Sequence, residues 1–213
     1  MNGRPIMRVF KSLLTALVLL VWTLPALADA PPGPRQVVEQ VTQDVLDLLE
    51  EQADELLEDR VALYEALEPI VGPHVAVERV AELILGPHWR RAEPELQARF
   101  VTAFQRSLVR TYGSTIGEYR GLEVRVLGVR RDPARENVAQ VGMDIHTGSG
   151  SPARVIYEME RQDDGHWRLI NLTAEGISLV QNYREDFRSR LRDRTLEEEV
   201  ARMEARNEEA GLE

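Results

Sequence analysis

Residues 153–174 read ARVIYEMERQDDGHWRLINLTA, two runs in which apolar and polar residues alternate. A period of two is typical of strands with one buried face, and the Asp-Gly pair in the link Asp163-Asp164-Gly165 is a strong hairpin signal. The same period extends upstream from this hairpin. The sequence therefore predicts an antiparallel meander of four strands, at 122–131, 137–147, 153–162 and 166–174.

Alternation gives each predicted strand an apolar side. These sides carry Val141, Met143 and Ile145 on the second strand, Val155, Tyr157 and Met159 on the third, and Trp167 and Leu169 on the fourth. One face of the sheet is thus apolar and must be covered by something other than water. A cover of helices gives an α+β layer fold.

Helical spacing of apolar residues precedes the strands. A first helix is predicted over 35–53, a second near 57–67 that stops near Pro69 and Gly72-Pro73, and a third over 77–85 that ends at Gly86-Pro87. The fourth begins at Pro94, and its apolar stripe consists of Leu96, Phe100, Phe104, Leu108, Tyr112 and Ile116. That stripe must face a large apolar surface.

Two more helices are predicted after the strands. Ser178 and Gln181 have the spacing of a capping box, and the stripe that follows contains Val180, Tyr183 and Phe187. Thr195 and Glu198 repeat the box before a last helix with a thin stripe, in which the acidic run 197–199 is interpreted as a solvated face. Residues 207–213 are expected to be a frayed tail.

The first 28 residues have the pattern of a secretory signal peptide. Three positive charges precede an apolar run over 12–24, and Ala26-Leu27-Ala28 is an A-x-A cleavage site. Cleavage after Ala28 removes three of 26 basic residues and no acidic ones, which leaves 23 against 36 and a net charge of −13. A flexible leader over 29–34 and a single domain over 35–206 are expected to follow.

Composition excludes several chemistries. The chain of 213 residues has a net charge of −10, which argues against binding to nucleic acid, and it has no cysteine for disulfides, thiolate catalysis or zinc ribbons. The four histidines, at 74, 88, 146 and 166, lack metal-ligand spacing. Ser178 lacks the G-x-S-x-G context of a nucleophile and is interpreted as a helix cap. No cofactor, metal or catalytic residue is predicted, and the protein is expected not to be an enzyme.

Several segments together resemble the MlaC family, also called toluene-tolerance proteins. The resemblance lies in Gly165-His166-Trp167 on a strand, Glu175-Gly176-Ile177-Ser178-Leu179 at a turn, and Asn182-Tyr183-Arg184 with Phe187 on a helix. It extends upstream to Gly86-Pro87-His88-Trp89-Arg90 and the aromatic stripe from Phe100 to Tyr112. In two places the chain departs from the family pattern. Asn171 stands where the family often has Asp, and Ile177 replaces Val.

The resemblance implies a periplasmic carrier that holds a phospholipid in a pocket between sheet and helices. It implies a conical fold, similar in general shape to nuclear transport factor 2, and a monomer that shuttles lipid between an outer-membrane lipoprotein complex and an inner-membrane MCE-domain protein coupled to an ABC transporter. Such a system maintains outer-membrane lipid asymmetry. A hopanoid or another polycyclic lipid is an alternative cargo. The residues that would line the pocket are Phe100, Phe104, Leu108, Val141, Met143, Ile145, Val155, Tyr157, Met159, Trp167, Leu169, Val180, Tyr183 and Phe187.

Two alternatives stay open at this stage. A pocket enzyme of the steroid-isomerase type would need a carboxylate or tyrosine inside the cavity, and Asp144 and Tyr157 are its candidates. Strand alternation places Asp144 on the outer face and Tyr157 on the inner one. The other alternative is an adaptor protein whose apolar interior is only a core.

Overall fold

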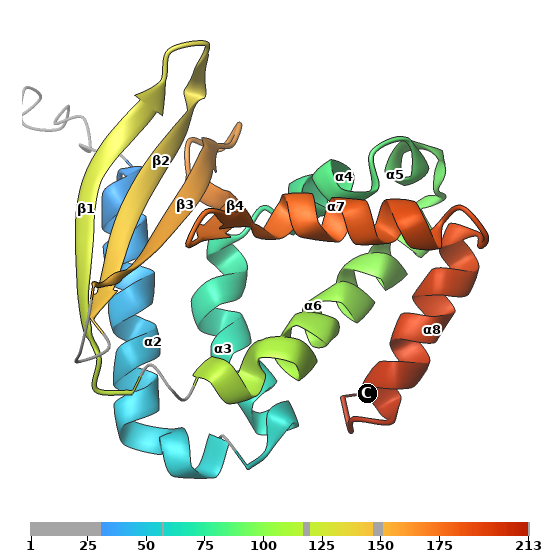
Figure 1. The fold of residues 1–213 in the computed structure, drawn as a ribbon, viewed down its shortest axis with the longest axis horizontal. Helices are drawn as coiled ribbons and strands as arrows, with labels where there is room; N and C mark the ends of the chain where they lie inside the picture. Colours follow the sequence, from blue (N-terminus) through green and yellow to red (C-terminus); the bar gives the residue numbers. More distant parts are fainter. Residues whose placement is uncertain (1–30, 57, 117–119, 147–150, 213) are drawn as a thin grey trace, which may run out of the picture. The chain divides into compact units, whose positions relative to one another are not determined.

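The computed structural model describes residues 31–56, 58–116, 120–146 and 151–212 (Figure 1). The predicted signal peptide and the first two residues of the leader lie outside these described residues. None of the described helices is long and apolar enough to cross a membrane.

Five antiparallel strands form one sheet in the order β1-β2-β3-β4-β5 (Figure 1). The strands are β1 (Glu123–Asp132), β2 (Arg135–His146), β3 (Ala153–Arg161), β4 (Trp167–Ala174) and β5 (Ile177–Ser178). The predicted α+β class and the four-strand meander are therefore confirmed. The short fifth strand was missed because it depends on a tight turn. In this turn Glu175 and Gly176 both have positive φ, 48° and 85°, and return the chain along β4.

Bulges interrupt the pairing of the long strands. The register between β1 and β2 shifts between Val126 and Val129, and the register between β3 and β4 shifts between Glu158 and Met159. Each extra residue bends its strand and increases the local twist. The long strands are therefore bent at these positions.

The described part of the chain contains six longer α-helices, which lie to one side of the sheet (Figure 1). They are α2 (Pro34–Leu56), α3 (Arg60–Val71), α4 (Val77–Leu85), α6 (Pro94–Ile116), α7 (Leu179–Arg190) and α8 (Leu196–Glu208), with a 3₁₀ turn η1 (Gly72–His74) and a five-residue helix α5 (Pro87–Arg91) between the longer elements. Helix α3 ends at Val71, directly before Gly72-Pro73, where the sequence predicts its stop, and Pro69 lies inside its last turn. The turn α5 was not predicted.

Gly86 separates α4 from α5. Its backbone has φ 55° and ψ −119°, a region that residues with a Cβ avoid, and its N–H donates to the carbonyl of Glu82 to close α4. The Gly86-Pro87 pair thus ends α4 and starts α5. The sequence predicted the end of α4 at this pair but not the start of α5.

The last two helices begin at capped residues. Ser178 accepts a hydrogen bond from the backbone N–H of Gln181, but the Gln181 side chain donates to Glu185 instead of returning to the cap, so that only half of the predicted capping box forms. The box of Thr195 and Glu198 is complete.

The C-terminal segment differs from the predicted frayed tail. Asn207 and Leu212 are only 1% and 2% exposed. The N–H of Leu212 donates to the carbonyl of Asn207 at 2.9 Å, which folds the last residues back on α8. The mostly polar sequence of residues 207–213 suggested fraying, but the buried Leu212 side chain holds this segment against the fold.

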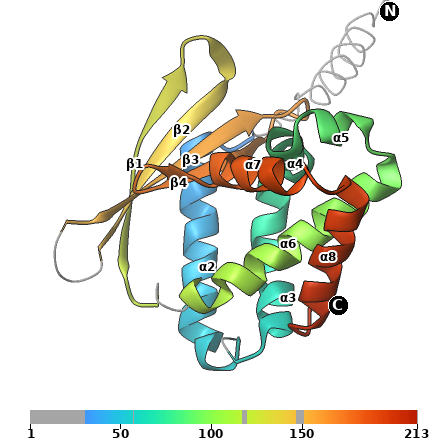
Figure 2. The ribbon, with the colours of Figure 1, turned by 45° about the vertical axis from the view of Figure 1, so that its right-hand side comes forward.

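Helix α2 lies along the sheet, whereas α6 and α8 lie farther from it (Figure 1, Figure 2). Helix α2 packs along β1, β2 and β4. Helix α7 contacts β4 and α4, whereas α6 packs against α3, α4 and α8. The apolar interior is therefore divided between parts on the sheet, a part among α4, α6, α7 and α8, and a smaller part between α2 and α3.

Candidate functional site

The inner face of the sheet has the residues that strand alternation predicts. Val141, Met143 and Ile145 of β2 are 0%, 4% and 5% exposed. Their partners across the ladder are Tyr157 opposite Val141 and Val155 opposite Met143. Side chains on one face of neighbouring strands pack together, so this register builds a continuous apolar surface.

A few weak polar contacts lie on this face. The sulfur of Met143 accepts from the hydroxyl of Thr42 on α2 at 3.8 Å and from the hydroxyl of Tyr157 at 3.9 Å. A thioether is a weak acceptor, so these contacts orient the hydroxyls with little energy. Thr42 and Tyr157 thereby place polar atoms at the border between α2 and an otherwise apolar sheet.

Asp144 lies on the outer face of β2. It pairs in register with Arg154 of β3 and accepts hydrogen bonds from that guanidinium, which is itself exposed. The steroid-isomerase hypothesis needs this carboxylate in the interior. The structure places the Asp144 carboxylate on the outer face, so Asp144 does not meet this requirement.

A second group of predicted site residues forms an aromatic cluster between α6 and α7. Phe100 and Phe104 stack with ring centroids 5.6 Å apart, and Phe187 meets Phe100 edge-on at 5.4 Å. Tyr183 meets Phe104 edge-on at 4.9 Å. Stacked and edge-on arrangements are the favourable geometries for aromatic pairs. This cluster fixes α7 on α6.

Tyr183 is the tyrosine of this aromatic cluster, and its pKa is shifted. Burial, followed by a side-chain hydrogen bond with Tyr112, raises the pKa of Tyr183 well above that of a free tyrosine. The phenol of Tyr183 is therefore harder to ionise than that of a free tyrosine.

The fourteen predicted pocket residues belong to three separate apolar clusters. The α6–α7 cluster contains Phe100, Phe104, Leu108, Val180, Tyr183 and Phe187. The cluster between β2–β4 and α2 contains Val141, Tyr157, Met159, Trp167 and Leu169. The cluster at the other end of the strands contains Met143, Ile145 and Val155, and Tyr157 contacts it as well. The structure therefore brings these residues together in groups, and Leu108, Tyr157, Leu169 and Tyr183 are only half-buried in theirs.

Sequence reasoning missed the contribution of α2 to this interior. Val37 and Val38 are 4% and 5% exposed and pack on the sheet cluster, with Val41 beside them. Their spacing did predict an amphipathic helix. Nothing in the spacing, however, said that its apolar stripe covers β2 and β4.

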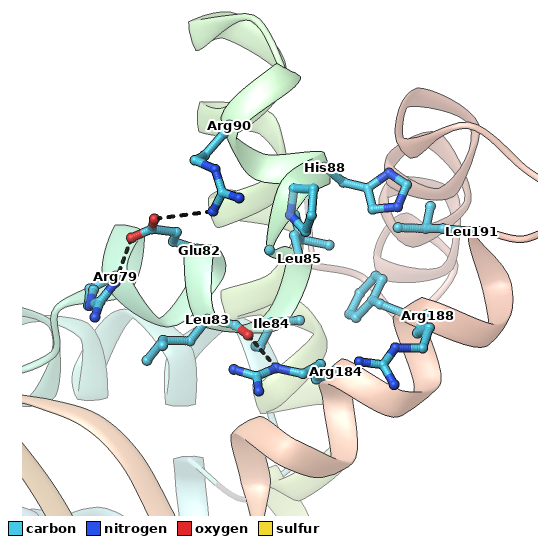
Figure 3. Close-up of a pocket in the computed structure, with 13 residues that line it drawn as sticks. Arg79, Glu82, Leu83, Ile84, Leu85, His88, Arg90, Arg184, Arg188 and Leu191 are labelled. Atoms are coloured by element: carbon cyan, nitrogen blue, oxygen red, sulfur yellow. Dashed lines mark hydrogen bonds and ion pairs between the residues drawn. The ribbon is translucent and has the colours of Figure 1, made fainter.

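An open groove of about 440 Å³ lies between α4, α5 and α7 (Figure 3). Its apolar part includes Leu83, Leu85 and Leu191, and its polar part consists of Glu82, His88 and four arginines: Arg79, Arg90, Arg184 and Arg188. Arg79 and Arg90 both pair with Glu82, at 2.7 Å and 3.9 Å. The Nε of Arg184 donates to the carbonyl of Leu83 at 2.7 Å and joins α7 to α4.

The described residues contain no group of three or more histidine, cysteine or acidic side chains that could hold a metal ion. The groove and the clusters offer apolar surface and arginines. Such surfaces bind and orient a partly apolar, partly anionic molecule.

Three comparisons relate the chain to known proteins. The family model described as MlaC protein matches residues 39–205. The toluene tolerance protein Ttg2D of Pseudomonas putida is 30% identical over 172 residues, which cover 80% of this chain and 79% of that protein. A phospholipid-binding protein from Ralstonia solanacearum, solved in complex with a phospholipid, has a similar fold with a TM-score of 0.73 at 22% identity, over 84% of this chain and 98% of that chain.

Proposed function

This chain belongs to the MlaC family, and from that premise we propose that it is a carrier that binds a phospholipid and moves it through the periplasm. The observation that carries the proposal is the match over 39–205, which includes both the sheet and the aromatic cluster. The Ralstonia protein with the same fold was solved with a phospholipid bound, which supports the choice of cargo.

Physical chemistry makes a carrier necessary for such a cargo. Each CH₂ group of an acyl chain costs roughly 0.8 kcal/mol to expose to water, so a diacyl lipid does not cross an aqueous space alone at a useful rate. A protein that covers the chains removes this cost without any covalent chemistry. The predicted absence of a catalytic site and of a cofactor fits this role.

The proposed seat of the acyl chains is the border between the sheet clusters and the α6–α7 cluster. The half-buried side chains Leu108, Tyr157 and Tyr183 already have part of their apolar surface outside the packed clusters. Helix α6 packs on other helices, and α2 packs on the sheet. Acyl chains inserted at this border would contact these half-buried side chains before any side chain of the packed clusters.

The remaining parts of the proposal concern location and partners. Export with cleavage after Ala28 would leave a mature protein that begins at Asp29, with its binding domain over 35–206. It would receive and deliver lipid at an outer-membrane lipoprotein complex and an inner-membrane MCE-domain protein coupled to an ABC transporter. A mature charge of −13 supports docking on proteins, because anionic lipid surfaces repel the chain.

Lipid analysis of the purified protein tests the proposal directly. The mature chain, expressed with its export signal and purified without detergent, is expected to show a mass increase of one phospholipid in native mass spectrometry. It is also expected to take up a labelled phospholipid from liposomes. Bare polypeptide together with no uptake would contradict the proposal, and a polycyclic lipid in the extract would replace phospholipid with the hopanoid class.

A further inference from the structure

Helices α7 and α8 form a depression of about 390 Å³ with an excess of positive charge. It is lined by Arg190, Arg194, Glu199, Arg202, Ala205 and Arg206. Four arginines around one carboxylate are unusual for a chain with a net charge of −10. This depression shares no lining residue with the groove between α4 and α7.

Glu199 neutralises part of this charge. Its side chain is fully buried and lies 2.8 Å from Arg190, 3.2 Å from Arg194 and 3.4 Å from Arg206. Arg190 has a second carboxylate in Asp186, at 2.6 Å. Three cations thus share one buried carboxylate, while the side chain of Arg202 is exposed and makes no ion pair within the described part of the chain.

Arg110 adds a fifth cation from α6. Its Nη1 atom is buried and has no hydrogen-bond partner among the described residues. Burial, followed by the charge of nearby Arg206, lowers the pKa of Arg110, and Arg190 acts in the same direction. A buried N–H group without an acceptor costs free energy, so this end of the arginine cluster lacks an anion.

The charges of the cluster do not balance. Besides Glu199, Asp186 pairs with Arg190, and Glu198 lies near Arg202 and Arg194. The hydrogen bonds of Glu198 with Thr195, and then the charges of Arg202 and Arg194, lower its pKa. These three carboxylates are outnumbered by five guanidinium groups: Arg110, Arg190, Arg194, Arg202 and Arg206. The surplus of about two positive charges matches one phosphate group, which carries between one and two negative charges near neutral pH.

We propose that the arginine cluster of α6, α7 and α8 is a binding site for a phosphate group. The planar fork of arginine matches phosphate oxygens in pairs. Arg190 of α7, Arg194 of the link to α8, and Arg202 and Arg206 of α8 line one depression, and Arg110 of α6 lies close enough to Arg206 and Arg190 for their charges to lower its pKa. The phosphate can belong to free inorganic phosphate or to the headgroup of a phospholipid. The second source rests on the proposed function, whereas the first does not.

The first experiment measures binding of inorganic phosphate by calorimetry at constant ionic strength, with chloride as the balancing anion. Saturable binding is expected for the wild-type protein. The test variant is Arg202→Gln, because it removes a cation of the depression and leaves all three partners of Glu199 in place. Its affinity for phosphate is expected to fall about tenfold or more.

Arg125→Gln is the matched control. Arg125 is an exposed residue of β1, so the substitution changes the net charge equally at a distant place. Its affinity for phosphate is expected to equal that of the wild type. A second variant, Arg110→Gln, is expected to weaken phosphate binding without lowering the unfolding temperature, since Arg110 Nη1 has no partner to lose within the described residues.

The second experiment separates the two sources with dihexanoyl phosphatidylglycerol below its micellar concentration. Lipid binding that phosphate displaces and that Arg202→Gln weakens would place the headgroup in the cluster. If the protein binds phosphate, but phosphate does not displace the lipid and Arg202→Gln does not weaken lipid binding, the cluster is assigned to free phosphate.

No saturable phosphate binding, or an equal loss in Arg125→Gln and Arg202→Gln, would overturn the phosphate site. In that case lipid found in the purified protein would leave the proposed function intact. The converse result, bound phosphate in a protein that never takes up lipid, would count against the carrier function and leave the phosphate site standing.

Discussion

Asn171 of β4 holds the start of α7 through one amide oxygen. Its Oδ1 accepts a hydrogen bond from the backbone N–H of Val180 at 3.2 Å and another from the hydroxyl of Ser178 at 3.0 Å. Ser178 in turn accepts from the backbone N–H of Gln181. Two N–H groups of the first turn of α7, which have no partner within the helix, are satisfied by this chain of contacts.

Because that oxygen lies at the positive end of a helix, Asn171→Asp is expected to stabilise the protein. A carboxylate can accept the same hydrogen bonds, and its charge interacts favourably with the helix dipole by about 0.5 kcal/mol. The free energy of unfolding, measured in urea at pH 7, should therefore rise. This substitution restores the residue that the family often has at the position.

The gain from Asn171→Asp depends on pH in a defined direction. The helix terminus stabilises the charged form, so the pKa of the new carboxyl falls below its unfolded value of about 3.9. The extra stability is present above that value and is lost as pH falls through the folded pKa. A gain that persists unchanged at pH 2, or a loss of stability at pH 7, would contradict this role of position 171.

The sheet was predictable from the sequence, and the reasons are local. Strands with one buried face need a period of two, and the buried set Val141, Met143 and Ile145 follows directly from that period. The Asp-Gly link before His166 fixed the last long hairpin. The turn at Glu175 and Gly176, which creates β5, depends on backbone angles that composition alone does not reveal.

The arrangement of the candidate site was not predictable, because it depends on contacts between distant segments. Arg184 and Leu83 are joined in the groove although about a hundred residues separate them. The burial of Glu199 likewise requires Arg190 and Arg206 to reach it from two helices. The interpretation of residues 197–199 as a solvated face is therefore wrong at Glu199, while Glu197 and Glu198 are exposed.

Glu199→Gln is expected to destabilise the protein by about 3 kcal/mol. The substitution keeps the size of the side chain but leaves three arginines without their shared carboxylate, and removal of one partner from a buried ion pair is costly for that reason. Glu208→Gln is the control, since Glu208 is an exposed residue of the same helix and its change should cost less than 0.5 kcal/mol. Equal unfolding midpoints for the two variants would show that the network at Glu199 contributes nothing.

Removal of residues 207–213 is expected to destabilise the fold, in contrast to the removal of a frayed tail. Asn207 donates from Nδ2 to the carbonyl of Ala103 at 2.9 Å and accepts from Ser107 at 3.3 Å, so it fastens α8 to α6. Loss of these buried hydrogen bonds and of the Leu212 side chain should cost about 2–4 kcal/mol. Thermal unfolding of the truncated chain measures this cost, and deletion of Glu213 alone serves as the comparison.

Gly86→Ala is expected to cost about 1–3 kcal/mol through the backbone alone. A Cβ at this position would meet no atom within 4 Å, so the penalty arises from φ 55° and not from a clash. Gly128→Ala on β1 is the matched control, because its added Cβ also meets no atom within 4 Å and its φ is not positive. Similar unfolding free energies for both variants would mean that a glycine is not required at position 86 between α4 and α5.

Met143→Trp distinguishes a lipid-binding interior from an ordinary core. Met143 is 4% exposed on the inner face of the sheet, and a larger side chain there would extend into the proposed seat of the acyl chains. If the interior opens to take lipid, the variant should fold and should carry several-fold less phospholipid than the wild type. If the interior is only a core, overpacking should instead cost about 1–3 kcal/mol of stability.

Leu63→Phe provides the control for Met143→Trp. Leu63 is 1% exposed and packs with Leu56 and Leu67 between α2 and α3, away from the fourteen predicted pocket residues. Overpacking at Leu63 should lower the unfolding temperature and leave the amount of bound phospholipid per folded protein unchanged. The two variants therefore separate loss of space from loss of stability. Wild-type lipid content in a destabilised Met143→Trp protein would mean that Met143 belongs to the core and that the acyl chains lie elsewhere.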